Sequence, residues 1–150
     1  MSNVPNALTR TEAWTREGVT SPETTLTAQM GKVFGYLKGL HATHVIDIGT
    51  KLGLFQRLAE APGLSPEVLS SLSGLQPPYV RQWCEAACAL ELLDYDPTMG
   101  FRLAPFMDQV LGQPDATFYL GGFPDVHLLV TRDYMRYPDL FRRGGTNPYK

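Results

Sequence analysis

The stretch that decides the fold is residues 64–103, LSPEVLSSLSGLQPPYVRQWCEAACALELLDYDPTMGFRL. Near its start, Ser65 and Pro66 predict a helix N-terminus, because serine caps the first amide groups and proline has the backbone angle of a first helical turn. Val68, Leu69 and Leu72 then supply an apolar face. The sequence therefore predicts a short amphipathic helix.

Gly74 ends this helix, and the tight turn Ser73-Gly74-Leu75 leads to another helix that begins at Gln76 or Pro77. Glycine permits the sharp bend that joins two helices at a steep angle. The apolar residues of the following helix recur at helical spacing: Val80, Trp83, Cys84, Ala87, Cys88, Leu90 and Leu92. After Leu93, residues 94–103 predict two short strands around a turn that contains proline and glycine.

Upstream, residues 54–59 form a short helical face that ends at Ala61-Pro62-Gly63. Residues 26–52 carry apolar side chains in steps of three and four, which predict a long helix with a break near His41. The order is then helix, helix, tight turn, helix and β-ribbon. This order predicts a mainly α-helical winged helix-turn-helix with a small β-hairpin wing and flanking helices.

Downstream, Ala104-Pro105 predicts the start of another short helix through Leu111. The aromatic-rich stretch 118–135 is expected to be helical after Pro124, and residues 138–143 to make one more turn. We expect three regions: a flexible arm at 1–21, a winged-helix domain with N-terminal dimerisation helices at 22–112, and an aromatic helical segment and linker at 113–150.

Composition limits the function classes. The 150 residues are 43% apolar, which is enough for a packed core, and their formal net charge of −2 gives no general attraction for a polyanion. No apolar run reaches the roughly 18 residues of a membrane span, and residues 1–21 lack a secretory apolar region. Cys84 and Cys88 are interpreted as small buried apolar residues in a reducing cytoplasm. We therefore expect a cytoplasmic protein.

Gly31, Gly35 and Gly39 lie four residues apart within the long predicted helix. Each costs about 1 kcal/mol relative to alanine in a helix interior. One interpretation is a weak helix with a bend. The other is a close helix–helix contact between two copies of the chain, because a stripe of small residues lets backbones approach.

Residues 45–53, VIDIGTKLG, suggest a cofactor-binding strand and glycine-rich turn. However, Lys51 occupies the middle glycine position, and the following residues do not predict the repeated crossover units of a parallel sheet. A helical face of Val45, Ile48 and Leu52 explains the same residues without a ligand. We favour that interpretation.

DNA binding is the main alternative, which would make the protein a transcriptional regulator. A winged helix inserts its third helix into the major groove, and Arg81 and Gln82 lie near the start of this helix. Glu85, Glu91 and Asp94 repel phosphates, and the 6–10 phosphate contacts of a tight DNA binder cannot be assembled. DNA is therefore an unfavoured partner.

Candidate ligand or interface residues are aromatic or apolar, with one histidine: Met30, Phe34, Tyr36, Phe118, Tyr119, Phe123 and His127. Such side chains suit small apolar ligands and protein interfaces. The competing interpretation is a satellite core that covers the winged helix. The three histidines lack the acidic or cysteine partners of a metal set, so no metal site is predicted.

Several runs of the sequence look like one known module: residues 52–59, 64–69, 74–75, 79–83, 92–96 and 101–104. They resemble the N-terminal winged-helix region of class I S-adenosylmethionine-dependent methyltransferases of the O-methyltransferase type, over about residues 26–145. The resemblance implies a homodimerising module that helps to form the wall of a pocket for a small apolar or aromatic substrate. It also implies that a Rossmann-like catalytic domain follows this region in the full-length enzyme.

By this resemblance, S-adenosylmethionine is the cofactor of the full-length enzyme, and residues 113–150 lead toward a catalytic domain that this chain lacks. No catalytic, cofactor-binding or metal-binding residue is assigned to this chain, and no activity is expected from it alone. A stand-alone binder of small molecules remains a further alternative.

Overall fold

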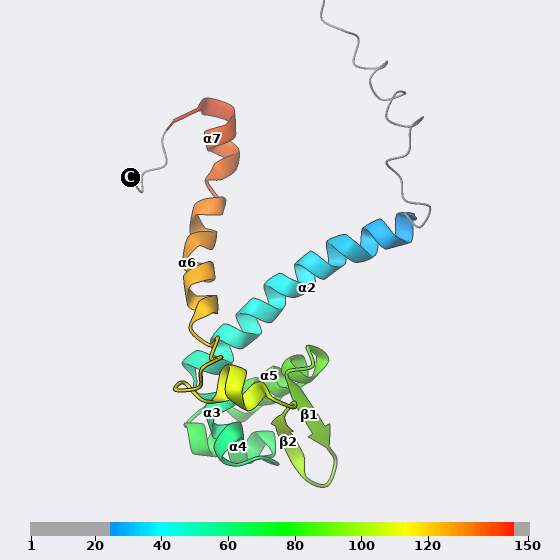
Figure 1. Ribbon diagram of the computed structural model, residues 1–150, viewed down its shortest axis with the longest axis vertical. Coiled ribbons are helices and arrows are strands. Elements are labelled where there is room, and N and C mark those ends of the chain that lie inside the picture. Colours follow the sequence, from blue (N-terminus) through cyan, green and yellow to red (C-terminus); the bar gives the residue numbers. More distant parts are fainter. Residues whose placement is uncertain (1–24, 146–150) are drawn as a thin grey trace, which may run out of the picture. The chain divides into compact units, whose positions relative to one another are not determined.

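The computed structural model describes residues 25–145 (Figure 1). The expected arm at residues 1–21 lies outside this range. The chain divides into two compact units between Lys38 and Gly39, so we describe each unit by itself. The elements in chain order are helices α2 (Leu26–Lys51), α3 (Leu54–Glu60), α4 (Pro66–Ser73) and α5 (Pro77–Ala89), strands β1 (Leu93–Asp96) and β2 (Gly100–Leu103), the π-helix η1 (Asp108–Gly112), and helices α6 (Phe123–Tyr134) and α7 (Tyr137–Arg143).

The ends of α4 have the predicted capping residues. The Ser65 hydroxyl accepts a hydrogen bond from the Val68 amide at 3.3 Å, and Pro66 occupies the first turn. Gly74 closes the helix in the left-handed conformation, with φ of 67°. The chain can therefore turn at once into α5, which begins at Pro77. Figure 1 shows α3, α4 and α5 gathered beside the β1–β2 hairpin, so the winged helix-turn-helix prediction is confirmed.

The hydrophobic core is built mainly from α3 and α5, and it includes residues from all parts of the winged helix. Its buried members are Leu54, Phe55, Leu58, Leu69, Val80, Trp83, Cys84, Ala87, Leu92, Leu93, Phe101 and Leu111. The rings of Phe55 and Trp83 meet edge to face with centroids 5.1 Å apart. The Trp83 indole N–H donates to the Val45 carbonyl at 2.9 Å, so the polar atom of this buried ring is satisfied.

The last turns of α2 approach this core closely at Gly49. A Cβ atom at this position would lie 2.4 Å from the Trp83 ring and 2.5 Å from the Phe55 ring. Glycine therefore permits the contact between α2 and the aromatic pair, because any larger residue would displace the rings. This packing fixes the C-terminal part of α2 to α3 and α5.

The wing is an antiparallel hairpin in which Leu93 pairs with Leu103 and Tyr95 pairs with Phe101. The Asp96 carboxylate accepts hydrogen bonds from the backbone amides of Thr98 and Met99, at 2.8 Å and 3.0 Å, and thereby holds the turn. Hydrogen bonds from Thr98 lower the pKa of Asp96. An isolated bridge between Leu64 and Phe101 also joins the segment before α4 to β2.

Two details of the helix expected over residues 26–52 are corrected by the structure. The helix α2 is continuous through His41, so the expected break there is wrong. Of the apolar face expected within residues 45–53, Val45 packs against the core as expected, whereas Ile48 and Leu52 are exposed. Ile46 packs against the core in their place, near the buried Gly49. The helical interpretation of this segment is confirmed, since no strand forms at residues 45–51.

The segment after the wing also differs from the expectation of a short helix from Ala104. Residues 104–107 form a turn in which Phe106 has a positive φ of 67°, and the π-helix η1 follows. Gly112 ends η1 against Ala59 and Leu103, where an added Cβ would lie 2.8 Å and 3.1 Å from side-chain carbons. Close packing on α3 therefore determines this geometry. Among residues 25–145, no helix has the length and apolar character needed to cross a membrane.

Candidate functional site

An apolar pocket of about 330 Å³ lies between the second half of α2, the η1 region and the start of α6. Its lining residues are Thr43, Ile46, Leu92, Met107, Val110, Leu111, Leu120, Phe123, Pro124 and His127. A hydrogen bond from the Leu120 amide to the Val110 carbonyl, at 2.8 Å, connects the loop before α6 to η1. The size is at the lower end of the range for small-molecule sites, about 300–1,000 Å³.

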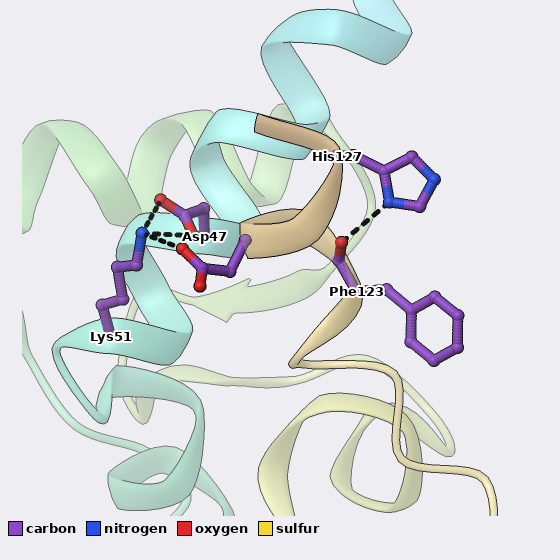
Figure 2. A network of polar contacts seen from close by, with 5 residues as sticks. Asp47, Lys51, Phe123 and His127 are labelled. Atoms are coloured by element: carbon purple, nitrogen blue, oxygen red, sulfur yellow. Dashed lines mark hydrogen bonds and ion pairs between the residues drawn. The ribbon is translucent and has the colours of Figure 1, made fainter. Parts of the chain in front are cut away.

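His127 is the one ionisable side chain in this lining. Its Nδ1 atom lies 2.8 Å from the Phe123 carbonyl oxygen, as Figure 2 shows. In the neutral tautomer that donates this hydrogen bond, Nε2 is left as an acceptor. The other polar side chain, Thr43, donates its hydroxyl proton to the Gly39 carbonyl at 2.9 Å. The pocket therefore has apolar walls and two polar side chains, those of Thr43 and His127.

An ion-pair cluster joins the end of α2 to the first turn of α6 beside this pocket (Figure 2). The Lys51 ammonium lies 2.7 Å from a carboxylate oxygen of Asp125 and 2.9 Å from one of Asp47. The hydrogen bond with Asp125, and then that with Asp47, raises the pKa of Lys51. Because the Lys51 and Asp125 side chains are both largely exposed, the ion pair between them contributes little to stability.

Of the predicted site residues, the structure brings Phe123 and His127 together in the pocket lining. Phe118 and Tyr119 lie in the preceding loop, outside the lining, and Phe118 is 70% exposed. Phe123 and Tyr134 are also exposed, and Tyr134 stacks edge to face on Tyr137 rather than on the core. Phe118 and Tyr134 therefore do not form the expected satellite core, whereas Phe123 lies beside the core residues Leu92 and Leu111 in the pocket lining.

The other predicted site residues belong to the first half of α2. Met30, Phe34 and Tyr36 are exposed there. The stripe of Gly31, Gly35 and Gly39 faces open space, since a Cβ added at any of the three would meet no atom of the described chain within 4 Å. Residues 25–145 thus make no use of these glycines for close packing. The contact between two copies remains a prediction.

Local sequence patterns do not identify most of the pocket. Ile46 belongs to a segment that resembles a cofactor-binding strand, and Met107, Val110 and Leu111 fit an ordinary short helix. Their spacing of three and four residues marks one face of a helical segment. That signal was available in the sequence. The meeting of this face with Leu92 and Leu120 depends on tertiary packing, which no local pattern contains.

In DNA-binding winged helices, the third helix and the wing face the DNA. In this chain the arginines of α5 and the wing are paired with carboxylates. Arg81 on α5 forms an ion pair with Glu67 on α4, and Arg102 on β2 lies 3.3 Å from Asp94 on β1. Glu85 adds a negative charge one turn after Arg81. A row of cations for phosphate contacts is therefore missing from α5 and the wing.

The remaining candidate chemistry concerns metals and thiols. Within residues 25–145, no three His, Cys, Asp or Glu side chains gather in a way that would hold a metal ion. Cys84 and Cys88 are free thiols, and Cys84 is buried as predicted. Burial raises the pKa of the Cys84 thiol to about 12 and also raises the pKa of Cys88. Both thiols are therefore protonated and unreactive near neutral pH.

Comparison with known proteins shows which proteins share this fold. Residues 41–111 match the family of Rv2258c-like winged HTH domains. No curated protein matches the chain. An O-methyltransferase family protein from Burkholderia thailandensis is similar in structure, with a TM-score of 0.62 and 17% identity over 79% of this chain and 34% of its own.

Two further structures are similar at the same level. Human N-acetylserotonin methyltransferase, in complex with SAM, has a TM-score of 0.65 and 16% identity over 85% of this chain and 38% of its own. N,N-8-amino-8-demethyl-D-riboflavin dimethyltransferase from Streptomyces davawensis has a TM-score of 0.65 and 22% identity over 81% of this chain and 35% of its own. The chain thus spans about a third of the length of these structures. Its residues 41–111 thus resemble Rv2258c-like winged HTH domains, and the chain shares the fold of the N-terminal region of these O-methyltransferase structures.

Proposed function

We propose that this chain is the N-terminal module of an S-adenosylmethionine-dependent small-molecule methyltransferase. In this proposal it pairs with a second copy and supplies part of the wall of the substrate pocket, whereas a Rossmann-like domain C-terminal to it binds the cofactor and carries the reaction. The observation that carries the proposal is the apolar surface of α2 and α6–α7, which lies exposed on a winged helix whose fold matches about a third of each methyltransferase structure.

The exposed apolar side chains support pairing. The first half of α2 exposes Leu26, Met30, Val33, Phe34, Leu37 and Leu40. Helices α6 and α7 expose Phe123, Val126, Leu129, Val130, Tyr134 and Phe141. Many exposed large apolar side chains on one element typically mark an interface. The glycine stripe of α2 would let a second helix approach closely, because no side chain separates the two backbones at these positions.

The apolar pocket supports the role in substrate binding. Its walls suit a flat apolar molecule, and His127 and Thr43 supply the polar side chains of its lining. A hydroxyl or amine on the ligand would donate to the Nε2 atom of the neutral His127 tautomer whose Nδ1 donates to Phe123. The chain alone is expected to bind neither S-adenosylmethionine nor any metal, because residues 45–51 are helical and the described residues offer no ligand set.

Sedimentation velocity tests the pairing. The 150-residue chain is expected to sediment as a dimer at micromolar concentration, and Phe34→Glu is expected to shift it to monomer, because a charge cannot be buried unpaired in an apolar interface. Lys32→Glu is the matched control: it changes charge on the same helix without removing an apolar side chain. A wild-type chain that is monomeric at every concentration contradicts the pairing.

Amide chemical shifts test the pocket. Titration with 2-naphthol is expected to shift signals of residues 43–46, 107–111 and 120–127. Phe123→Ala should weaken this binding, whereas Phe118→Ala should not, since Phe118 lies outside the lining. Equal effects of the two variants would contradict the pocket assignment. Duplex DNA at about 150 mM salt should leave the spectrum unchanged, and a salt-sensitive shift of α5 signals would favour the regulator instead.

A further inference from the structure

A second recess lies between α4, α5 and the β-hairpin, and it shares no lining residue with the apolar pocket. Its volume is about 760 Å³, well within the range of small-molecule sites. In a DNA-binding winged helix, the third helix and the wing would face the nucleic acid. Here the space between them has a different chemistry.

The α5 side of the recess presents Arg81, Glu85 and Cys88 on one helix face, at spacings of four and three residues. Arg81 is neutralised by its ion pair with Glu67 on α4. Glu85 has no ion-pair partner among the side chains that the structure describes and is exposed to solvent. The recess therefore carries one unpaired carboxylate and no unpaired cation.

The hairpin side is aromatic and apolar. The Tyr95 ring lies against Phe101 with centroids 4.7 Å apart, and Phe101 is buried while Tyr95 is 58% exposed. Met99, at the hairpin turn, adds an exposed thioether. Exposed aromatic faces and methionine sulfur attract flat apolar groups, and aromatic faces also attract cations.

The walls of this recess are fixed by backbone hydrogen bonds. The Phe101 amide donates to the Leu64 carbonyl at 2.9 Å, and the Gly63 amide donates to the Phe101 carbonyl at 2.8 Å. The Asp96 carboxylate holds the turn that carries Met99. A preformed site loses little free energy to ordering when a ligand binds.

We propose that this recess binds a small organic cation with a flat apolar body. The ammonium group lies at the Glu85 carboxylate, and the apolar body lies against Tyr95 and Met99. Charge complementarity selects this class: the unpaired carboxylate attracts a cation and repels carboxylates and phosphates. The site is independent of the apolar pocket, so its test does not depend on the methyltransferase proposal.

Three probes with one apolar body test the charge preference: 4-phenylbutylamine, 4-phenylbutanol and 4-phenylbutyrate, each titrated into the 150-residue chain at pH 7. Amide chemical shifts are expected to move at residues 65–68, 81–88 and 95–101. The amine should bind about three- to fivefold more tightly than the alcohol, as expected for one exposed ion pair, and the carboxylate most weakly. Equal affinities for the three, or shifts located elsewhere, would overturn the proposal.

Two variants test whether Glu85 causes the preference for the amine. Glu85→Gln should weaken amine binding about three- to fivefold and leave alcohol binding unchanged. Glu91→Gln is the matched control, because it removes a nearby charge outside the recess lining and should change neither affinity. If Glu85→Gln binds the amine as tightly as the wild-type chain, the proposal is wrong.

Discussion

The winged-helix body, which comprises α3, α4, α5 and the β1–β2 hairpin, buries large apolar side chains, whereas helices α6 and α7 expose theirs. In the body, Phe55 and Leu69 are fully buried, and Trp83 is both packed and hydrogen-bonded. In α6 and α7, Leu129 is two-thirds exposed and Phe141 is almost completely exposed. The first half of α2 resembles α6–α7 in this respect. The comparison teaches that the body supplies its own core, whereas these helices carry apolar surface that the described chain leaves uncovered.

The largest expected effect contrasts a buried phenylalanine with an exposed one. Phe55→Ala should lower the free energy of unfolding by about 3–5 kcal/mol, because it leaves a cavity beside Trp83. Phe106→Ala, at a ring that is 75% exposed, should change it by less than about 0.5 kcal/mol. Urea unfolding of both variants measures the difference. Similar losses in the two would mean that the core is not where the structure places it.

The next effect contrasts two glycines of the same helix. Gly49→Ala should cost about 1–3 kcal/mol, because its Cβ overlaps the rings of Trp83 and Phe55. Gly35→Ala should instead stabilise the isolated chain by up to about 1 kcal/mol, since its Cβ meets open space in a helix interior. Thermal unfolding at low chain concentration compares them. A destabilising Gly35→Ala would show that this part of α2 is packed after all.

The sequence predicts the body better than it predicts α6–α7 and the pocket. Helix starts at Ser65 and Pro77, the turn at Gly74 and the hairpin all depend on local chemistry, and each is present in the structure. The π-helix η1 was not predictable, because the packing of Gly112 on Ala59 determines it. The pocket joins Ile46, Leu92 and Leu120 from distant segments, which no periodicity encodes.

A third effect concerns the buried thiol of Cys84. The unfolded chain ionises this thiol from about its ordinary pKa of 9.0, whereas burial raises the folded-state pKa to about 12. The stabilisation that the protonated Cys84 thiol gives to the folded state is therefore complete below pH 9. As the pH rises from 9 toward 12, the unfolded chain ionises this thiol first, and the free energy of unfolding falls. At pH 10 the wild-type chain should be about 1.4 kcal/mol less stable than at pH 8 through this group.

The matched variant for this effect is Cys84→Ala, which should flatten the difference between pH 8 and pH 10 in urea unfolding. Cys88→Ala should flatten it less, because Cys88 is only partly buried. If both variants keep the full wild-type pH dependence, the Cys84 thiol does not cause it.

The smallest effect concerns the ion pair between the body and α6. Asp125→Asn should change the free energy of unfolding by less than about 0.5 kcal/mol, because the Lys51–Asp125 pair is exposed. Amide chemical shifts of residues 127–134 should nevertheless move, since this pair connects α6 to α2. Asp139→Asn, which removes an ion pair within α7, is the control and should leave these α6 shifts unchanged. Unchanged α6 shifts in Asp125→Asn would show that the pair does not help to position α6.

Amide hydrogen exchange at several chain concentrations tests the central contrast most directly. Residues 54–93 should be protected to the same extent at every concentration, because their core is complete within one chain. Residues 26–40 and 123–143 should exchange rapidly in dilute solution and become protected as the concentration rises, because a second copy covers their apolar side chains. Protection of these helices that is independent of concentration, or their rapid exchange at every concentration, would contradict the account.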